Sequence, residues 1–134
     1  MRQWGGRFSE SPSEIMLTFS ESLSYDRRLW PYDIAGSMAH VKMLKKQGVL
    51  SEGEAQRILD GLEKVKAAFS KGDIPEDISL EDVHTAVEST LRAELGDLAG
   101  KVHTARSRND QIALDMHLWC VDAAGKLKEA VRKV

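Results

Sequence analysis

Two neighbouring stretches of the chain carry apolar residues at helical spacing. After Pro31, apolar side chains recur at steps of three and four residues until Gly48, at Ile34, Met38, Val41 and Leu44. The second stretch follows the sequence SEGE of residues 51–54, and its stripe comprises Ala55, Ile58, Leu59, Leu62, Val65 and Phe69. Such spacing places side chains on one face of an α-helix, and SEGE is typical of a capping box. The pattern therefore predicts two helices joined as a hairpin.

Two further helices are predicted downstream. After a loop around Pro75, one helix should start at Ser79, carry His84 in its first turn and end at Gly96, with Val83, Val87, Leu91 and Leu95 facing inward. After a short break at residues 97–100, the last helix should begin near Ser107 with another capping box and continue to the final residue. That is about 42 Å at 1.5 Å per residue. Its apolar positions wander around the helix, which predicts partner helices beyond this chain.

The N-terminal part of the chain is less regular. Residues 1–10 read as an irregular arm with Trp4 and Phe8 as anchors, followed by a helix that starts at Ser11. Ile15, Met16 and Phe19 form the apolar side of that helix, and the polar segment 20–28 is expected to be a loop. Strand-like alternation is missing from the sequence, so we expect an all-α fold. We divide it into an N-terminal helical domain (1–106) and the start of a long helix (107–134).

Composition narrows the class of protein. The 134 residues include 19 basic and 21 acidic side chains, for a net charge of −2. This balance disfavours a general nucleic-acid or membrane-surface binder. The only cysteine is Cys120, which excludes an intrachain disulfide and favours a reducing compartment. The N-terminus lacks the apolar core of a signal peptide, and no apolar run is long enough to span a bilayer. We therefore expect a cytoplasmic protein without a membrane partner.

The segment GKVHTARSRNDQ, residues 100–111, is the strongest candidate for chemistry. Its four basic or titratable side chains, Lys101, His103, Arg106 and Arg108, precede the start of the last helix. A helix N-terminus offers free backbone N–H groups and partial positive charge, so the segment predicts a pocket for a carboxylate or phosphate. Arg108 would be the carboxylate clamp. The alternative is that the arginines pair with Asp82, Asp97 or Asp110, as in a structural ion-pair network.

The histidines do not predict a metal centre. His84 and His103 lack HxxxH or CxxC spacing, so general acid–base work or hydrogen bonding suits them better than a metal. His40 and His117 read as surface or interface residues. RNA binding is a minor alternative for the basic segment, because aromatic residues do not interleave it. We expect no metal, no cofactor and no nucleic-acid partner.

Several motifs together resemble a known family. GKVHTARSRNDQ followed by IALDMHLW, with WGGRF, SLSYDRRLW and EDVHTAVESTL in the same order, is similar to the argininosuccinate lyases of the fumarase and aspartase superfamily, which also includes the delta-crystallins. The resemblance implies the superfamily's N-terminal helical domain plus the first part of a long central-bundle helix. It also implies a homotetramer in which three chains build each site.

The resemblance implies a reaction and its residues. The family cleaves argininosuccinate into arginine and fumarate by β-elimination, without a cofactor, through a carbanion that preorganised donors must stabilise. His84 would assist through hydrogen bonds, and Asp26 and Asp82 would orient neighbours. The implied substrate-binding residues are Ser22, Arg108 and Asn109, with Thr104 and Ser107 as weaker neighbours. The family's catalytic histidine, mobile-loop serine and lysine motifs do not occur here, so we expect the main acid and base beyond Val134.

The sequence leaves three functional interpretations open. The first is the N-terminal portion of an argininosuccinate lyase, inactive when isolated. The second is a crystallin-like structural relative that keeps the fold without activity. The third is a small helical module that binds an anion or a protein partner in its own right.

Overall fold

The part of the protein that the structure describes is mainly helical. The structure, a computed structural model, describes residues 13–134, and these contain no strand. The elements in chain order are α1 (Glu14–Ser20), α2 (Leu23–Asp26), η1 (Arg27–Leu29), α3 (Trp30–Lys46), α4 (Glu52–Ser70), η2 (Ile78–Leu80), α5 (Val83–Leu95), η3 (Gly96–His103) and α6 (Arg108–Arg132), where η denotes a 3-10 helix. The predicted all-α fold is confirmed. The predicted arm, with Trp4 and Phe8, lies outside the described residues.

Side-chain caps set the starts of α4 and α6. At α4, the Ser51 hydroxyl accepts from the backbone N–H of Glu54 at 3.3 Å, and Glu54 Oε2 accepts from the backbone N–H of Ser51 at 3.0 Å. At α6, Ser107 and Asp110 form the same kind of box. Reciprocal bonds of this kind satisfy backbone donors that a helix start leaves free. Both predicted capping boxes are confirmed.

Other predicted boundaries were wrong. The α5 helix starts at Val83 and not at Ser79, because Glu81 has a left-handed backbone (φ 69°) that separates it from η2. The N-cap of α1 is Ser13, whose hydroxyl accepts from the backbone N–H of Met16 at 3.3 Å; the predicted cap, Ser11, lies outside the described residues. The predicted loop 20–28 contains α2 and η1, and the predicted break 97–100 lies inside η3. Short helices of this kind have too few residues to show a period.

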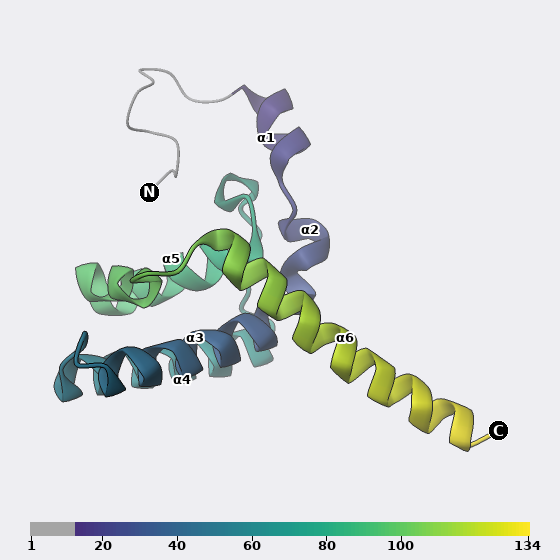
Figure 1. Ribbon diagram of the computed structural model, residues 1–134. Helices are drawn as coiled ribbons and strands as arrows, with labels where there is room; N and C mark the ends of the chain where they lie inside the picture. Colours follow the sequence, from purple (N-terminus) through teal and green to yellow (C-terminus); the bar gives the residue numbers. More distant parts are fainter. Residues whose placement is uncertain (1–12) are drawn as a thin grey trace.

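The core forms where α3, α4 and α5 pack together. In Figure 1, α3 and α4 lie side by side as a hairpin, and α5 packs against α4. Fully buried apolar side chains line this contact: Ile34, Val41, Ala55, Ile58, Leu62, Val65, Val87 and Leu91. Gly61 permits the close approach of α5, because a Cβ there would lie 2.8 Å from Leu91 Cδ1. The predicted stripes thus become one core.

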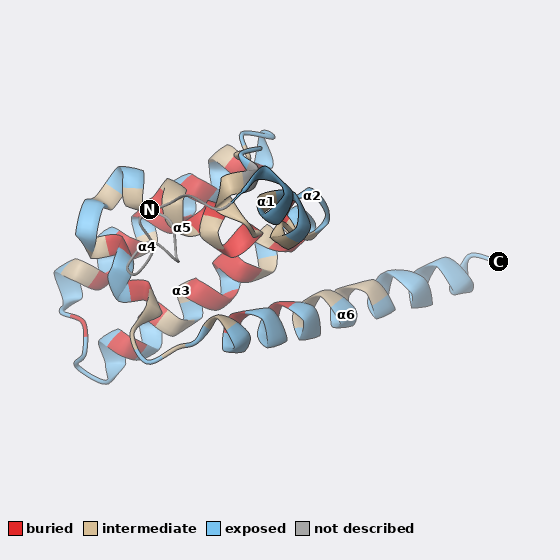
Figure 2. Ribbon diagram, turned by 90° about the horizontal axis from the view of Figure 1, so that it is seen from above, coloured by how far each residue is buried: buried red, intermediate tan, exposed pale blue. Residues whose placement is uncertain are grey.

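The α6 helix leaves this core after its first turns. Figure 2 shows α6 projecting away from the other helices, with buried positions only near its start. Among the described residues of α6, only Gln111 and Asp115 are buried, whereas Leu127 and Val131 are each 66% exposed. The apolar side of α1 is also uncovered, with Phe19 86% exposed. Within residues 13–134, no helix combines the length and apolar character that crossing a membrane requires.

Candidate active site

The loop that carries Ser22 is attached to the start of α5. The backbone N–H of Ser22 donates to the Glu81 carbonyl at 2.7 Å, and the Ser22 hydroxyl donates to Asp26 Oδ2 at 2.6 Å. The other oxygen of Asp26 accepts from the backbone N–H of Val83 at 3.1 Å. Burial raises the pKa of Asp26, and the hydrogen bond from Ser22 opposes this shift. Ser22 is therefore linked through Asp26 to Val83, the residue before His84, although 62 positions of sequence separate Ser22 from His84.

Arg108 reaches the same end of α5 from the first turn of α6. Its Nε lies 3.4 Å from Asp82 Oδ2, and its Nη2 donates to Thr85 Oγ1 at 3.2 Å. Asp82 is also the N-cap of α5 and accepts from the backbone N–H of Thr85 at 2.7 Å. Three segments that are distant in sequence, bearing Ser22, His84 and Arg108, thus converge on one helix start.

The structure agrees in part with the alternative that the arginines of the basic segment pair with Asp82, Asp97 or Asp110. Arg108 does pair with Asp82, as that alternative states. Asp97 instead faces Arg92 at 3.8 Å, and Asp110 accepts from the backbone N–H of Ser107 at 2.9 Å. Two further side chains of the segment, Lys101 and His103, face acidic side chains of other helices. Lys101 pairs with Glu54, and His103 Nε2 lies 3.0 Å from Glu88 Oε2, an interaction that lowers the pKa of Glu88.

The smaller polar residues of the segment have mostly structural contacts. The Thr104 hydroxyl donates to the Lys101 carbonyl at 2.7 Å, and the Ser107 hydroxyl accepts from the backbone N–H of Asn109 at 3.0 Å. Ala105 has a left-handed backbone (φ 56°) and turns the chain from η3 into α6. The side chain of Asn109 is exposed beside Arg108. Asn109 is therefore accessible to solvent in the first turn of α6.

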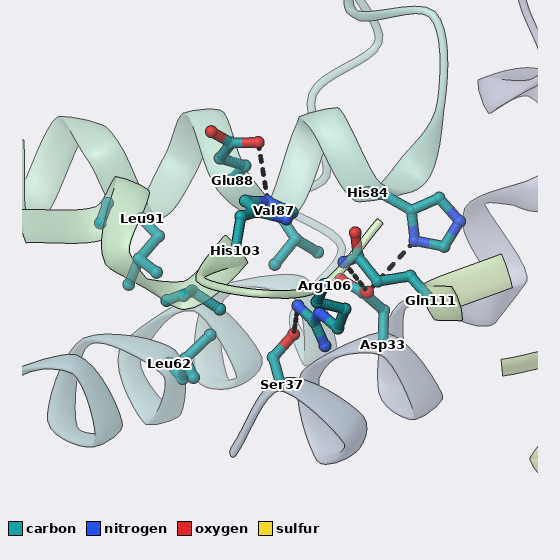
Figure 3. A pocket seen from close by; sticks show the side chains of 12 residues that line it. Asp33, Ser37, Leu62, His84, Val87, Glu88, Leu91, His103, Arg106 and Gln111 are labelled. Atoms are coloured by element: carbon teal, nitrogen blue, oxygen red, sulfur yellow. Dashed lines mark hydrogen bonds and ion pairs between the residues drawn. The ribbon is translucent and has the colours of Figure 1, made fainter. Parts of the chain in front are cut away.

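A buried polar cluster lies behind this helix start. Asp33 of α3, His84 of α5, and Gln111 and Asp115 of α6 are 1%, 3%, 3% and 1% exposed. His84 Nδ1 lies 3.1 Å from Asp33 Oδ1, and Gln111 Nε2 donates to Asp33 Oδ1 at 2.8 Å (Figure 3). The same His84 nitrogen lies 3.4 Å from Asp115 Oδ2. Polar groups at such depth need partners, because an unpaired buried polar atom is costly. The cluster joins three helices through side-chain hydrogen bonds.

Burial and like charge perturb the ionisable groups of the cluster. Burial, together with the neighbouring Asp33, raises the pKa of Asp115 to about 7. Burial lowers the pKa of His84, but the hydrogen bond and charge of Asp33 outweigh it, so the net shift is upward. Burial also lowers the pKa of the Arg106 guanidinium, which donates to Ser37 Oγ at 3.1 Å. Perturbed titrations of this kind are characteristic of functional sites, although ion-pair networks share them.

The same cluster contains groups of the type that bind metals. One nitrogen or oxygen atom from each of Asp33, His84 and Asp115 lies within 4.8 Å of the others. The guanidinium of Arg106 interacts with both carboxylates and adds positive charge beside them. A cation would have to displace that charge, and His84 Nδ1 already faces Asp33. The donor set therefore suits a hydrogen-bonded network better than a metal ion.

Sequence reasoning named His84 and the segment that ends at Gln111, but it assigned no site role to Asp33, Ser37 or Asp115. Asp33 and Ser37 are four positions apart on α3, as are Gln111 and Asp115 on α6. Each pair lies on the face by which its helix packs. One signal was available in the sequence: Asp33 and Ser37 lie on the same face of α3 as the apolar stripe that contains Ile34. The cavity bounded by Asp33, Ser37, His84, Arg106 and Gln111 is small, about 10 Å³.

Comparison with known proteins identifies relatives over nearly the whole chain. Residues 6–134 match a family described as lyase. The chain is 43% identical over 133 residues to the argininosuccinate lyase of Syntrophotalea carbinolica, covering 99% of this chain and 29% of the relative. Argininosuccinate lyases of Streptococcus agalactiae and Ehrlichia chaffeensis are 48% and 45% identical over 131 residues, each covering 98% of this chain and 28% of the relative. The chain thus spans less than a third of the length of these curated relatives.

Proposed function

Because the chain belongs to the lyase family, we propose that the complete protein carrying this sequence cleaves argininosuccinate into arginine and fumarate by β-elimination. The observation that supports this most is the convergence of Ser22, His84 and Arg108 on the start of α5. The family resemblance gives these three residues roles at one substrate, and such roles require that they lie together. Similarity to argininosuccinate lyases over 98–99% of the chain supports the same substrate class.

We propose that this end of the fold binds substrate carboxylates. The guanidinium of Arg108 presents a planar fork that can pair with two oxygens at once, and its side chain is 22% exposed. Asn109 offers an exposed amide in the first turn of α6, whose N-terminus favours an anion. Donors placed there before the carbanion forms would stabilise the charge that develops on the adjacent carboxylate. Ser22 would bind from the opposite side, with Thr104 and Ser107 holding the segment in shape.

We propose that proton transfer needs residues outside this chain. His84 is buried and assists through hydrogen bonding, and the acid and base come from further segments of a cytoplasmic homotetramer that uses no cofactor. Residues 1–106 would form the helical domain and 107–134 the first part of a central-bundle helix. The exposed apolar side chains of α6 support this arrangement, because large apolar side chains exposed along one helix suit a helical partner.

The function is tested by measuring fumarate formation by its ultraviolet absorbance. The complete protein should turn over argininosuccinate, whereas the 134-residue chain alone should not. A complete protein that folds and lacks turnover would exclude the lyase and leave the crystallin-like interpretation. Turnover by the isolated chain at a comparable rate would contradict the assignment of the acid and base to other segments.

Asn109→Ala in the complete protein tests the substrate contact. We expect kcat/KM to fall by the equivalent of roughly 1 to 3 kcal/mol, because a polar group of the substrate would be left unpaired. Gln56→Ala, which removes an exposed amide from α4, is the matched control and should keep wild-type kinetics. Unchanged kinetics in Asn109→Ala would remove this residue from the site.

A further inference from the structure

We propose that Asp33 and Gln111 are positioning residues that hold the His84 imidazole with its proton on Nδ1 and connect it to Arg108. The proposal rests on the proposed function, since it assigns a role to two buried residues of the same site. Neither residue touches the surface at which substrate would bind, so both act through the side chains they contact. Each step of the connection is a hydrogen bond between side chains. The Arg108–Gln111 bond lies within the start of α6, and the bonds of Asp33 with Gln111 and His84 join different helices.

Gln111 has one orientation that satisfies both of its neighbours. The Arg108 guanidinium can only donate, and its Nη1 donates to Gln111 Oε1 at 3.3 Å. The amide nitrogen of Gln111 therefore faces the other way and donates to Asp33 Oδ1 at 2.8 Å. Asp33 Oδ1 is thus an acceptor in this network.

The role of Asp33 Oδ1 as an acceptor determines the protonation of His84. Nδ1 of His84 lies 3.1 Å from this same oxygen, and a carboxylate oxygen that accepts there places the hydrogen on Nδ1. In a histidine, the hydrogen bond made by one ring nitrogen sets the state of the other. Neutral His84 therefore keeps its lone pair on Nε2, at the ring edge away from Asp33 (Figure 3). The imidazole is held as an acceptor on that side.

The connection places two functional side chains in a fixed relation. It runs from Arg108 through the Gln111 amide and the Asp33 carboxylate to His84, and Asp33, Gln111 and His84 are each at least 97% buried. Apolar side chains of similar volume could join α3, α5 and α6 without the desolvation cost of a carboxylate. Packing alone therefore does not account for a carboxylate and an amide here. Holding one tautomer in one place does account for them.

The charged groups facing His84 set the expected response to mutation. They are Asp26 from α2, Asp33 from α3, Asp82 at the start of α5, and Arg108 and Asp115 from α6. Asp33→Asn keeps an oxygen of the same shape and removes one negative charge. The pKa of His84 should then fall, because an adjacent opposite charge favours the protonated ring.

The tautomer is tested by nitrogen-15 NMR of labelled histidine in the 134-residue chain. Wild-type His84 should show a protonated Nδ1 throughout its titration, and Asp33→Asn should titrate at lower pH. Asp60→Asn is the matched control, because Asp60 accepts from Gln56 Nε2 at 2.8 Å on the exposed face of α4 and should leave His84 unchanged. A neutral wild-type His84 with its proton on Nε2 would overturn the proposal.

The kinetic test uses the complete protein. Asp33→Asn should lower kcat about 10- to 100-fold with little change in KM, and should move the pH profile in the direction of the His84 shift. Should that variant not fold, Gln111→Met serves instead and should lower kcat while Gln56→Met does not. Wild-type kcat and pH profile in a folded variant would overturn the positioning role. Lack of fumarate formation by the wild-type protein would refute the proposed function instead, and the tautomer measurement would still decide the geometry.

Discussion

Asp115→Asn is expected to stabilise the folded chain by about 4 kcal/mol at pH values above the Asp115 pKa. Burial beside Asp33 raises that pKa from its usual 3.8 to about 7. Between these values the folded chain holds a proton that the unfolded chain releases, so wild-type stability is greatest at the acidic end and falls as the pH rises through about 7. Asparagine has no proton to lose and removes this decline. The raised pKa of His84 acts in the same direction.

Urea unfolding of both proteins over a series of pH values measures this effect. The difference between their free energies of unfolding should be small near the usual pKa of an aspartate and largest above pH 7. Asp122→Asn on the same helix is the control: hydrogen bonds from Lys126 and Tyr32 lower the pKa of Asp122, so its contribution is lost as the pH falls. Parallel curves for wild-type and Asp115→Asn would contradict the prediction.

Leu62→Ala is expected to cost about 3 kcal/mol of unfolding free energy, from the lost transfer energy and the cavity left behind. Leu62 is fully buried where α4 meets α5, and it borders the small cavity next to Asp33 and His84. Thermal or urea unfolding measures the loss. Leu59→Ala, three positions earlier on the same helix and only partly buried, is the matched control and should cost clearly less. Equal losses in the two variants would show that the packing at Leu62 is not as described.

The long helices could be predicted from the sequence because their burial is periodic. The stripe from Ala55 to Phe69 and the capping box at Ser51 each contain the physical reason for α4. Helix α2 could not be predicted in this way, since it has four residues and is attached to Glu81 by long-range hydrogen bonds. The exposure of the distal part of α6 depends on which neighbours are present, and a hydrophobic pattern alone does not specify them.

The sequence predicted those residues of the candidate site that belong to the family motifs. The resemblance placed Ser22, His84 and Arg108 in one site, and the structure brings their segments together. Sequence adjacency also grouped Lys101 and His103 with Arg108. The structure pairs these two residues with Glu54 and Glu88, and only His103 borders the small cavity beside His84. Asp33 and Asp115 were overlooked because a polar residue on a helix reads as exposed until its tertiary neighbours are known.

The docking of α6 by its first half gives the free end of the helix the mechanics of a lever. Asp115 is its last buried residue, and Asp122 still accepts from the Tyr32 hydroxyl at 2.6 Å. Arg132 lies about 15 Å beyond Asp122 along the axis at 1.5 Å per residue. A tilt of about 5° at Asp122 would therefore move the far end by about 1 Å, which is within the range of helix shifts that accompany switching between states. A partner bound to the distal part would thus act on the docked half of α6, which carries Gln111 and Asp115.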